Sequence, residues 1–393
     1  MQLGELLGRI SAQRLQDLAL SLVQIPSPTG DSVQVTEHYA DYLRRIGLEV
    51  ELRYDVADRF PKSPSLAARL RGGPGPTLQL DGHLDTIPAE HAAPYCRDGI
   101  IHGRGATDMK SGLTAMAEAA RVLMESGARL KGNLLLTAHG LHEAPTGRGE
   151  GLSALVAHGI HGDMAIVTEG RIRELEVVGL GQSTFEIVIR REGEVVHELQ
   201  APPGAPHPIL VGHELVGRLL ERNAELARVD IPLTGPESIF IGIFEGGDFY
   251  NRLPTTCRIM GTRRYAPEKS HRDIQREFEE LVDEMARKHH VAISLDLRKT
   301  REGYRMGEDN LARRVLQAAA KDVLGQPLVE VGQRSVGDVS ILTREAGIPA
   351  GYLGVGHGAH SSNEHVSVDE LVLLTRMLLA AICHYPGLAE AGN

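Results

Sequence analysis

Four short apolar runs constrain the fold most, because each of them ends in a cluster of polar residues. The runs are residues 77–80, 134–138, 164–168 and 348–355, and a helical pattern over residues 113–123 separates the first two. Strands that alternate with helices predict an open α/β sheet. Such sheets bind ligands beyond the carboxyl ends of their strands, which is where the polar clusters stand. The sequence therefore places a candidate site at that edge of the sheet.

The middle of the chain follows a different pattern. Residues 182–190 alternate apolar and polar side chains, as in a half-buried strand, and residues 274–285 carry an amphipathic helical pattern. Because the strand–helix alternation stops here, we expect a smaller α+β domain at residues 180–296. It would be inserted into a larger domain made of residues 1–179 and 297–393. The predicted fold class is α/β, with an open mixed sheet flanked by helices and this inserted domain.

Composition excludes two classes of partner. Lys and Arg number 42 against 52 Asp and Glu, a net charge of −10, and the chain has no basic run and no Trp. A protein of this kind is a poor binder of phosphate backbones and of stacked bases. The longest uncharged stretch, residues 346–363, is interrupted by Pro349 and several glycines, so it cannot cross a bilayer. We expect neither nucleic acid nor membrane as a partner.

Cysteine usage points to a compartment. Cys96, Cys257 and Cys383 are too few and too scattered for a disulfide framework, which fits a reducing environment. The first residues form an amphipathic polar helix without the charged-then-apolar order of a signal peptide. These features predict a cytoplasmic protein.

Two segments, DGHLDTIP and GRGATDMKSG, carry residues that suit a metal. His83 and Asp85 stand two positions apart, and Asp108 follows 25 residues after His83. A neutral imidazole together with carboxylates suits Zn²⁺ or a similar divalent ion. Asp85 is placed to accept a hydrogen bond from the ligating imidazole. Taken singly, His83 can be a core histidine and Asp108 a helix cap.

Three more candidate ligands follow at other predicted strand ends. They are Glu143, Glu169 and His360. Crowded carboxylates are unfavourable unless a cation compensates for their repulsion. Two histidines and three carboxylates can hold two metal ions if one carboxylate bridges, and such ions, about 3.5–4 Å apart, polarise a carbonyl and activate water. The favoured chemistry is therefore hydrolysis of an amide or ester.

These segments resemble the zinc amidohydrolases and exopeptidases that include aminoacylase, acetylornithine deacetylase, succinyl-diaminopimelate desuccinylase and a bacterial glutamate carboxypeptidase. The resemblance rests on the HLDT and GRGATDMKSG blocks in this order and extends from QIPSPTGD to SSNEHVSVDEL. It implies two divalent metal ions, Zn²⁺ first and Co²⁺ or Mn²⁺ as alternatives. It also implies a catalytic domain with an inserted lid and dimerisation domain, a homodimer, and a small-molecule or short-peptide substrate with a free carboxylate.

The resemblance also implies a role for each candidate ligand. Asp108 bridges the two metals. The remaining ligands divide between them, with His83 and Glu169 on one metal and Glu143 and His360 on the other. Asp85 orients His83.

One position departs from the family pattern. Where relatives have the general-base Glu, this chain has His142. An imidazole can accept a proton from water, with an unperturbed pKa of about 6.5. Beside two cations it can equally become an extra ligand, and Glu150 is a third candidate for the base. His142 as the base is the leading interpretation.

The inserted domain carries three residues that match the family. His197 matches a histidine that stabilises an oxyanion in the neighbouring subunit of dimeric relatives, although a surface histidine is the alternative. Asn251 and Arg264 match residues that bind the substrate carboxylate, for which Arg offers two parallel N–H groups. Arg263 is expected to be an outward, solvated charge. Asp338 matches an element near the site, or else caps a helix.

The leading functional prediction is a dinuclear metal-dependent hydrolase that cleaves the amide bond of an N-acyl amino acid or a related carboxylate, as a deacetylase or desuccinylase does. One alternative is an exopeptidase that cuts dipeptides or tripeptides or acts as a carboxypeptidase. A second alternative is a non-catalytic homologue that binds metal and ligand, because the general-base Glu is replaced by His142.

Overall fold

A computed structural model describes residues 2–56 and 58–389, and the chain divides into two compact units. The larger unit comprises the residues up to 177, residues 306–331, and those from 337 onward; the smaller comprises residues 178–305 and 332–336. The smaller unit is thus inserted between parts of the larger one. Within the described residues, every helix is too short or too polar to span a bilayer.

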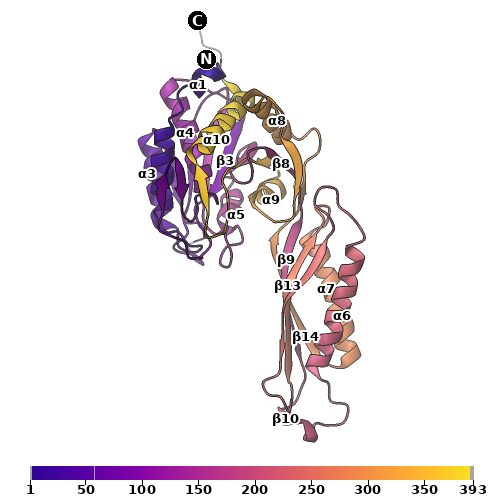
Figure 1. The fold of residues 1–393 in the computed structure, drawn as a ribbon. Coiled ribbons are helices and arrows are strands. Elements are labelled where there is room, and N and C mark those ends of the chain that lie inside the picture. Colours follow the sequence, from indigo (N-terminus) through magenta and orange to yellow (C-terminus); the bar gives the residue numbers. More distant parts are fainter. Residues whose placement is uncertain (1, 57, 390–393) are drawn as a thin grey trace. The chain divides into compact units, whose positions relative to one another are not determined.

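The larger unit is built on a six-stranded mixed sheet (Figure 1). The four strands β6, β3, β7 and β17 run parallel, and β1 and β2 add to the β6 edge in antiparallel fashion. In spatial order the strands are β1 (Glu49–Arg53), β2 (Ser65–Leu70), β6 (Asn133–His139), β3 (Thr77–His83), β7 (Met164–Val167) and β17 (Ala350–Tyr352). The four predicted apolar runs all contribute strands, and the predicted open mixed sheet is confirmed.

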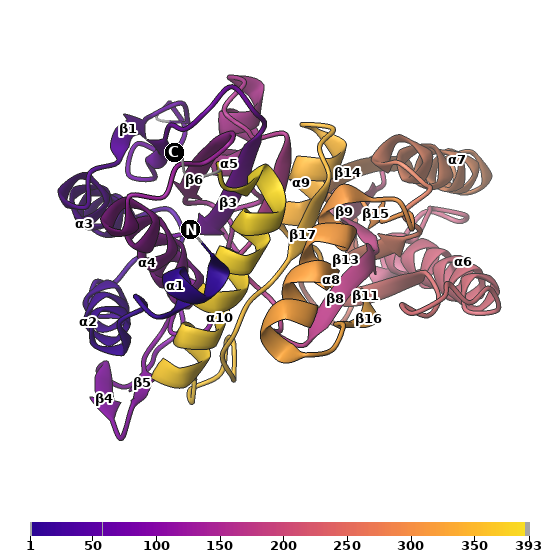
Figure 2. The same ribbon diagram turned by 90° about the horizontal axis from the view of Figure 1, so that it is seen from above.

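Helices cover both faces of this sheet (Figure 2). One face packs against α3 (Val33–Arg45), α4 (Lys110–Ser126) and α8 (Leu311–Leu324), with α10 (Val368–Ile382), α2 (Ala12–Val23) and α1 (Leu3–Leu7) outside them. The other face packs against α5 (Glu150–Ala157) and α9 (Asp338–Arg344). Because neighbouring strand residues point to opposite faces, both faces need apolar side chains, which explains the uninterrupted apolar runs.

Two predicted elements differ in length from their patterns. The helix predicted over residues 113–123 extends over α4, Lys110–Ser126, and ends at Gly127, whose φ of 70° suits a left-handed helix cap. The run at residues 348–355 forms only the three-residue strand β17. Pro349 has no N–H for the ladder, although its carbonyl still accepts a hydrogen bond from Ala165.

Short strands complete the larger unit and its connections. A small sheet of order β18-β5-β4 comprises β18 (His365–Ser367), β5 (Ile100–His102) and β4 (Tyr95–Arg97). A second has the order β15-β8-β16, with β15 (Tyr304–Arg305), β8 (Glu174–Gly179) and β16 (Val329–Gln333). A turn of π-helix, Cys383–Gly387, follows α10.

The smaller unit is a four-stranded antiparallel sheet packed against two helices. In spatial order the strands are β11 (Ser238–Gly246), β13 (Thr256–Tyr265), β9 (Gly181–Arg190) and β14 (Ala292–Arg301), and the helices are α6 (Pro208–Leu226) and α7 (His271–His289). Alternate residues of β9, from Ser183 to Ile189, are buried against the helices. A short ribbon pairs β10 (Val196–His197) with β12 (Arg252–Leu253), and a 3₁₀ turn, Glu198–Gln200, follows β10. The predicted fold class, α/β with an inserted α+β unit, is confirmed.

The prediction for Arg263 is wrong. Its side chain is fully buried, and its Nη2 lies 2.6 Å from Glu237 Oε2 and 3.1 Å from Glu277 Oε2. Successive residues of β13 alternate between faces, so Arg263 points toward the helix side that carries Glu277. A buried guanidinium is stable only when carboxylates pair with it, and here two of them do.

Candidate metal centre

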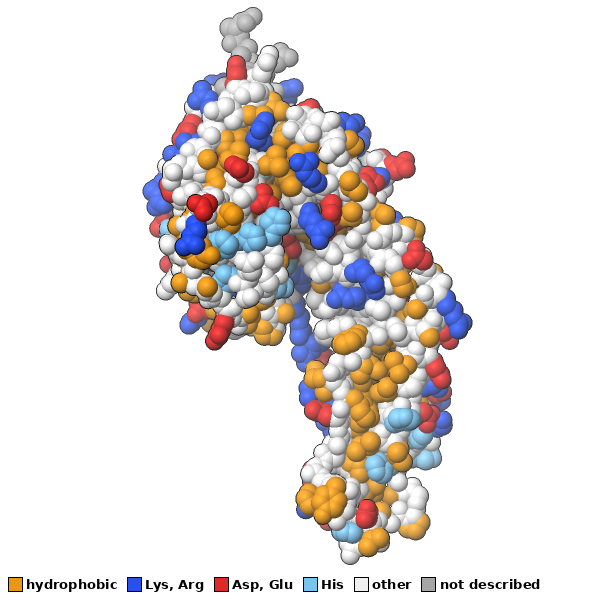
Figure 3. All heavy atoms as spheres, viewed as in Figure 1, with side chains coloured by type: hydrophobic (Ala, Val, Ile, Leu, Met, Phe, Trp, Pro, Cys, Tyr) orange, Lys and Arg blue, Asp and Glu red, His pale blue; other side chains and the backbone are white. Residues whose placement is uncertain are grey.

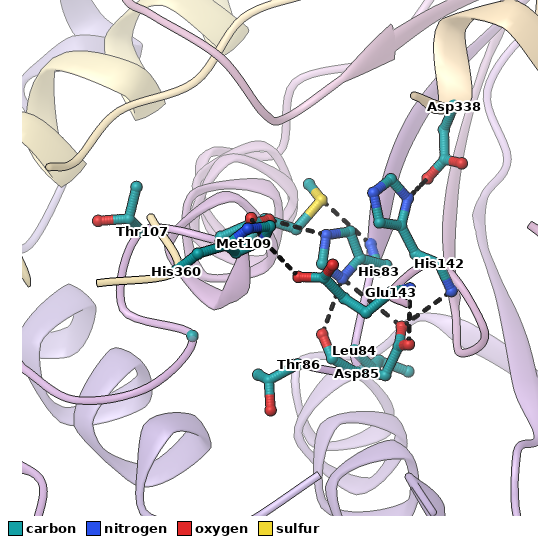
Figure 4. A network of polar contacts seen from close by, with 12 residues as sticks. His83, Leu84, Asp85, Thr86, Thr107, Met109, His142, Glu143, Asp338 and His360 are labelled. Carbon is teal, nitrogen blue, oxygen red and sulfur yellow. Dashed lines mark hydrogen bonds and ion pairs between the residues drawn. The ribbon is translucent and has the colours of Figure 1, made fainter. Parts of the chain in front are cut away.

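The carboxyl ends of three neighbouring strands and two further loops bring the predicted ligands together (Figure 4). His83 is the last residue of β3, Glu143 follows β6, and Glu169 follows β7. Asp108 precedes α4, and His360 lies in the loop between β17 and β18. Neighbouring parallel strands end at the same edge of a sheet, so residues far apart in the sequence meet there.

Asp108 lies at the centre of this group. Its Oδ1 is 2.9 Å from His83 Nε2, and its Oδ2 is 3.0 Å from His360 Nε2. His360 Nε2 is also 3.0 Å from Glu143 Oε1. Ligand atoms of His83, Asp108 and Glu143 lie within 4.8 Å of one another, as do those of His83, His142 and Glu169. Asp108 therefore contacts one imidazole with each oxygen, as a bridging carboxylate would contact two metal ions.

The charges of this group are strongly coupled. Burial opposes ionisation of Asp108, but hydrogen bonds from His360 and His83 outweigh it and hold the pKa of Asp108 well below its usual range. The contacts with Asp108 and Glu143 raise the pKa of His360 to about 10. Burial, followed by the charge of Asp108, raises the pKa of Glu169 to about 7. Asp108 and Glu143 are thus paired with imidazoles, whereas Glu169 has no such pairing and its ionisation is opposed.

The donor set fits divalent metal ions. Glu169 Oε2 is buried and has no hydrogen-bond partner among residues 2–56 and 58–389. A buried carboxylate in this position, beside other carboxylates, is favourable when a cation binds it. Imidazole nitrogens and carboxylate oxygens at one site suit Zn²⁺ and related ions, which would replace the imidazole protons.

Asp85 supports the group in two ways. Its backbone carbonyl oxygen lies 2.8 Å from His83 Nδ1, whereas its carboxylate Oδ1 is 3.6 Å from that nitrogen. Its carboxylate oxygens accept hydrogen bonds from the backbone N–H groups of His142, at 3.2 Å, and Glu143, at 3.0 Å. The main chain of Asp85 therefore orients His83, and its side chain holds the segment that carries Glu143.

His142 is held between an imidazole and a carboxylate. Its ring stacks on that of His83, with 4.0 Å between ring centroids and 8° between planes. Its Nδ1 lies 2.7 Å from Oδ2 of Asp338, a fully buried residue at the start of α9. Burial favours the neutral ring, but the Asp338 charge outweighs burial and raises the pKa of His142 to about 8. When Nδ1–H donates to Asp338, Nε2 is the ring nitrogen that remains for another contact.

Sequence reasoning missed a buried polar layer behind His142. His139 Nε2 lies 3.4 Å from Asp81 Oδ2 and 3.5 Å from Asp338 Oδ2. Thr137 Oγ1 donates to Asp81 Oδ1 at 2.5 Å. The detectable signal was the two-residue spacing of Asp81 from His83 and of Thr137 from His139, which places these polar side chains on one face of an apolar sheet.

The other candidate base, Glu150, is engaged locally. It is the first residue of α5, and its Oε2 accepts a hydrogen bond from the backbone N–H of Arg148 at 2.6 Å. His142, by contrast, contacts the buried carboxylate of Asp338.

Three predicted residues lie in the smaller unit. His197 Nδ1 accepts a hydrogen bond from Leu199 N–H at 3.2 Å. Its Nε2 is 3.0 Å from Asn251 Nδ2, so His197 and Asn251 are neighbours. Arg264 lies on β13, where its Nη1 donates to the carbonyl oxygen of Arg334 at 2.5 Å.

Residues 79–384 match the model of peptidase family M20/M25/M40. The chain belongs to this family. It is therefore a hydrolase of the metallopeptidase and amidohydrolase type, and the resemblance predicted from its sequence is confirmed.

Curated relatives cover nearly the whole chain. N-formyl-4-amino-5-aminomethyl-2-methylpyrimidine deformylase of Bacillus subtilis is 25% identical over 93% of this chain and 93% of its own length. Succinyl-diaminopimelate desuccinylase of Gluconacetobacter diazotrophicus is 26% identical over 92% of this chain and 94% of its own.

Solved structures share the fold. Aminopeptidase PepT from Bacillus cereus superposes with a TM-score of 0.78 at 21% identity, covering 95% of this chain and 98% of its own. A dinuclear metal-binding M20 peptidase from Bacillus subtilis has a TM-score of 0.73 at 15% identity, with 96% of this chain and 99% of its own covered. A metal-binding site in this chain accords with these findings.

Metal removal tests the donor set. We expect Zn²⁺ added to chelator-treated protein to raise the melting temperature, because binding to the native state alone contributes about 2.7 kcal/mol at a hundredfold excess over Kd. Glu169→Gln should shrink this rise, whereas Glu49→Gln, at an exposed carboxylate paired with Arg71, should not. Thermal unfolding with and without metal measures both, and an unchanged melting temperature would contradict the site.

Proposed function

We propose that this protein is a dinuclear metal-dependent hydrolase that cleaves the amide bond of an N-acyl amino acid or a related substrate with a free carboxylate. The observation that carries the proposal is the position of Asp108, whose two oxygens face the imidazoles of His83 and His360 at 2.9 and 3.0 Å. The names of the relatives, a deformylase and desuccinylases, support removal of an acyl group from an amine.

The proposed ligand sets are those that the family resemblance implies. Asp108 would be shared by both ions; His83 and Glu169 would complete one set, and Glu143 and His360, whose Oε1 and Nε2 lie 3.0 Å apart, would complete the other. We propose Zn²⁺ as the metal, with Co²⁺ and Mn²⁺ as alternatives that accept the same nitrogen and oxygen donors. When bound, two such ions polarise a scissile carbonyl and lower the pKa of water.

His142 is the proposed general base. Its Nδ1–H donates to Asp338, so Nε2 is the nitrogen that accepts a proton from the attacking water when the ring is neutral, which a pKa of about 8 places above neutral pH. The Asp338 carboxylate then stabilises the imidazolium, and Nε2 returns the proton to the departing amine nitrogen. Asp338 thus sets both the tautomer and the orientation of His142.

Residues of the smaller unit are proposed to bind the substrate. Arg264 has one Nη occupied by the Arg334 carbonyl, which fixes its guanidinium while other N–H groups of the fork remain for a carboxylate. Asn251, which lies beside His197 next to the β10–β12 ribbon, is the second residue proposed to bind the substrate carboxylate. His197 is proposed to donate an imidazole N–H to the oxyanion that develops during amide cleavage.

A homodimer is proposed through the smaller unit. Both β11 and β14 are edge strands of its sheet. The β14 edge carries charged residues such as Asp296 and Arg298, which discourage pairing, whereas β11 is apolar and exposes Phe240 and Phe244. Figure 3 shows apolar side chains gathered along this unit. His197 would then act in the partner's site, as the sequence resemblance implies.

A cytoplasmic location is part of the proposal. All three cysteines lie in the described residues and are free thiols, which suits a reducing compartment.

A substrate panel tests the reaction. With Zn²⁺ or Co²⁺ present, we expect hydrolysis of N-formyl, N-acetyl or N-succinyl amino acids, and weaker hydrolysis of their methyl esters. Arg264→Ala should lower kcat/KM for the free acids about 10- to 100-fold, the value of a hydrogen bond to a charged group. Arg258→Ala, an exposed change on the same strand, is the control.

The panel also separates the alternatives. Hydrolysis of dipeptides and tripeptides, with acyl amino acids untouched, would indicate an exopeptidase. Bound metal without turnover of any substrate at any pH would indicate a non-catalytic binding protein.

The base assignment has its own test. We expect His142→Ala to lower kcat about 10²- to 10⁴-fold, with metal content unchanged. His142→Glu should restore part of this loss, and Glu150→Ala should leave kcat near that of the wild type. Steady-state kinetics and elemental analysis measure the two quantities. If only Glu150→Ala abolishes turnover, or if His142→Ala loses a metal ion, the assignment is wrong.

Mixed dimers test the subunit arrangement. His197→Ala and Asp108→Ala should each be nearly inactive alone. Co-expressed in equal amounts, they should recover about a quarter of wild-type activity, because half of the dimers contain one site with intact metal ligands and a partner His197. A monomeric mass by light scattering, or a mixture no more active than either variant, would refute the arrangement.

A further inference from the structure

The carboxylate of Glu364 accepts hydrogen bonds from an entire ligand-bearing loop. Its Oε1 lies 3.0 Å from each of the backbone nitrogens of Gly105, Thr107 and Asp108, and its Oε2 lies 2.7 Å from Arg104 Nη1. Glu364 is fully buried. One side chain therefore satisfies three backbone N–H groups and a guanidinium that would otherwise be buried without partners.

This contact matters because the loop has no regular structure of its own. Residues 103–108 lie between the end of β5 and the start of α4, outside any helix or strand. The backbone of Asp108 is thus placed neither by a sheet ladder nor by helical hydrogen bonds. Its N–H donates to Glu364, so the position of the proposed bridging carboxylate depends on that side chain.

The same contact joins the loop to a second ligand. Glu364 stands four residues after His360, in the segment between β17 and β18. Thr107 ties the two segments together again, since its hydroxyl lies 2.9 Å from the carbonyl oxygens of His357 and His365. Glu364 and Thr107 therefore hold Asp108 and His360 against each other at the 3.0 Å spacing observed.

The charge of Glu364 is already paired, so its proposed role differs from that of a metal ligand. Both oxygens of Glu364 are engaged by N–H donors, and Arg104 balances its negative charge. Glu364 therefore adds no uncompensated charge to a centre already crowded with carboxylates. Its contribution is geometric.

We propose that Glu364 is a positioning residue of the metal centre, which holds Asp108 and His360 at coordination spacing without touching metal or substrate. The inference rests on the proposed metal-dependent function. Because Asp108 is shared between both ligand sets, loss of Glu364 weakens binding of both ions.

Glu364→Gln is the direct test. The amide keeps the shape of the side chain, but its NH₂ group must face either the backbone N–H groups or the Arg104 guanidinium. In both orientations two hydrogen-bond donors face each other, so hydrogen bonds are lost. We expect zinc affinity to fall about 10- to 100-fold, as for other residues that support metal ligands. Competition with a chromophoric chelator measures the zinc affinity, and the melting temperature of the metal-free protein is measured in parallel.

Glu118→Gln is the matched control. Glu118 is also buried, contacts Arg14 at 2.7 Å and accepts a hydrogen bond from the backbone N–H of Ser11 at 2.9 Å, but it lies in α4, outside the centre. We expect it to lower the melting temperature while zinc affinity stays that of the wild type. This separates positioning of the ligands from general stability.

Thr107→Val provides a second, milder variant that is informative even if Glu364→Gln does not fold. It removes the hydroxyl that joins the two segments, and we expect a smaller loss of zinc affinity. The inference is overturned if Thr107→Val binds zinc with wild-type affinity. It is also overturned if Glu364→Gln folds, has a lowered melting temperature and still binds zinc with wild-type affinity. A wild-type protein that binds none of Zn²⁺, Co²⁺ and Mn²⁺ overturns the proposed function itself, and the role of Glu364 with it.

Discussion

Buried carboxylates that face one another are the constraint on which the larger unit depends. Asp108, Glu143 and Glu169 converge at one edge of the sheet, and their repulsion in a site shielded from water has to be compensated. Contacts with these carboxylates raise the pKa values of His83 and His360, which favours protonated imidazoles as one source of compensation. The same geometry that makes these histidines basic makes them suitable ligands once cations replace the protons.

A second set of buried acids holds the first in place. Asp85 binds the backbone that carries Glu143, Asp338 binds the His142 ring, and Glu364 binds the loop that carries Asp108. Each of these carboxylates is itself satisfied by N–H donors, so it orders a loop without adding free negative charge. Hydrogen bonds to buried carboxylates thereby fix the candidate ligands that lie in loops without regular structure.

The His142 ring is fixed by its surroundings. The ring stacks on His83 and donates to Asp338, and His139 and Asp81 continue the line of alternating imidazoles and carboxylates into the sheet. An imidazole in this position has one nitrogen fixed by a buried acid and the other available. This is the arrangement that a histidine base requires, and a solvated histidine would lack it.

The sequence by itself determined the strands, the edge at which they end and the residue types suited to metal binding, because apolar periodicity and short motifs are local properties of the chain. The pairing of His142 with Asp338, 196 residues away, and the four hydrogen bonds of Glu364 were decided only by the tertiary structure. Burial of Arg263 was also decided by the tertiary structure. A single charged residue in a strand is expected to be solvated, and only the packing of α7 against the sheet places Glu277 next to it. Local sequence patterns predict the face of a helix or strand on which a residue lies. Which residues it contacts on that face depends on how elements distant in the sequence pack together.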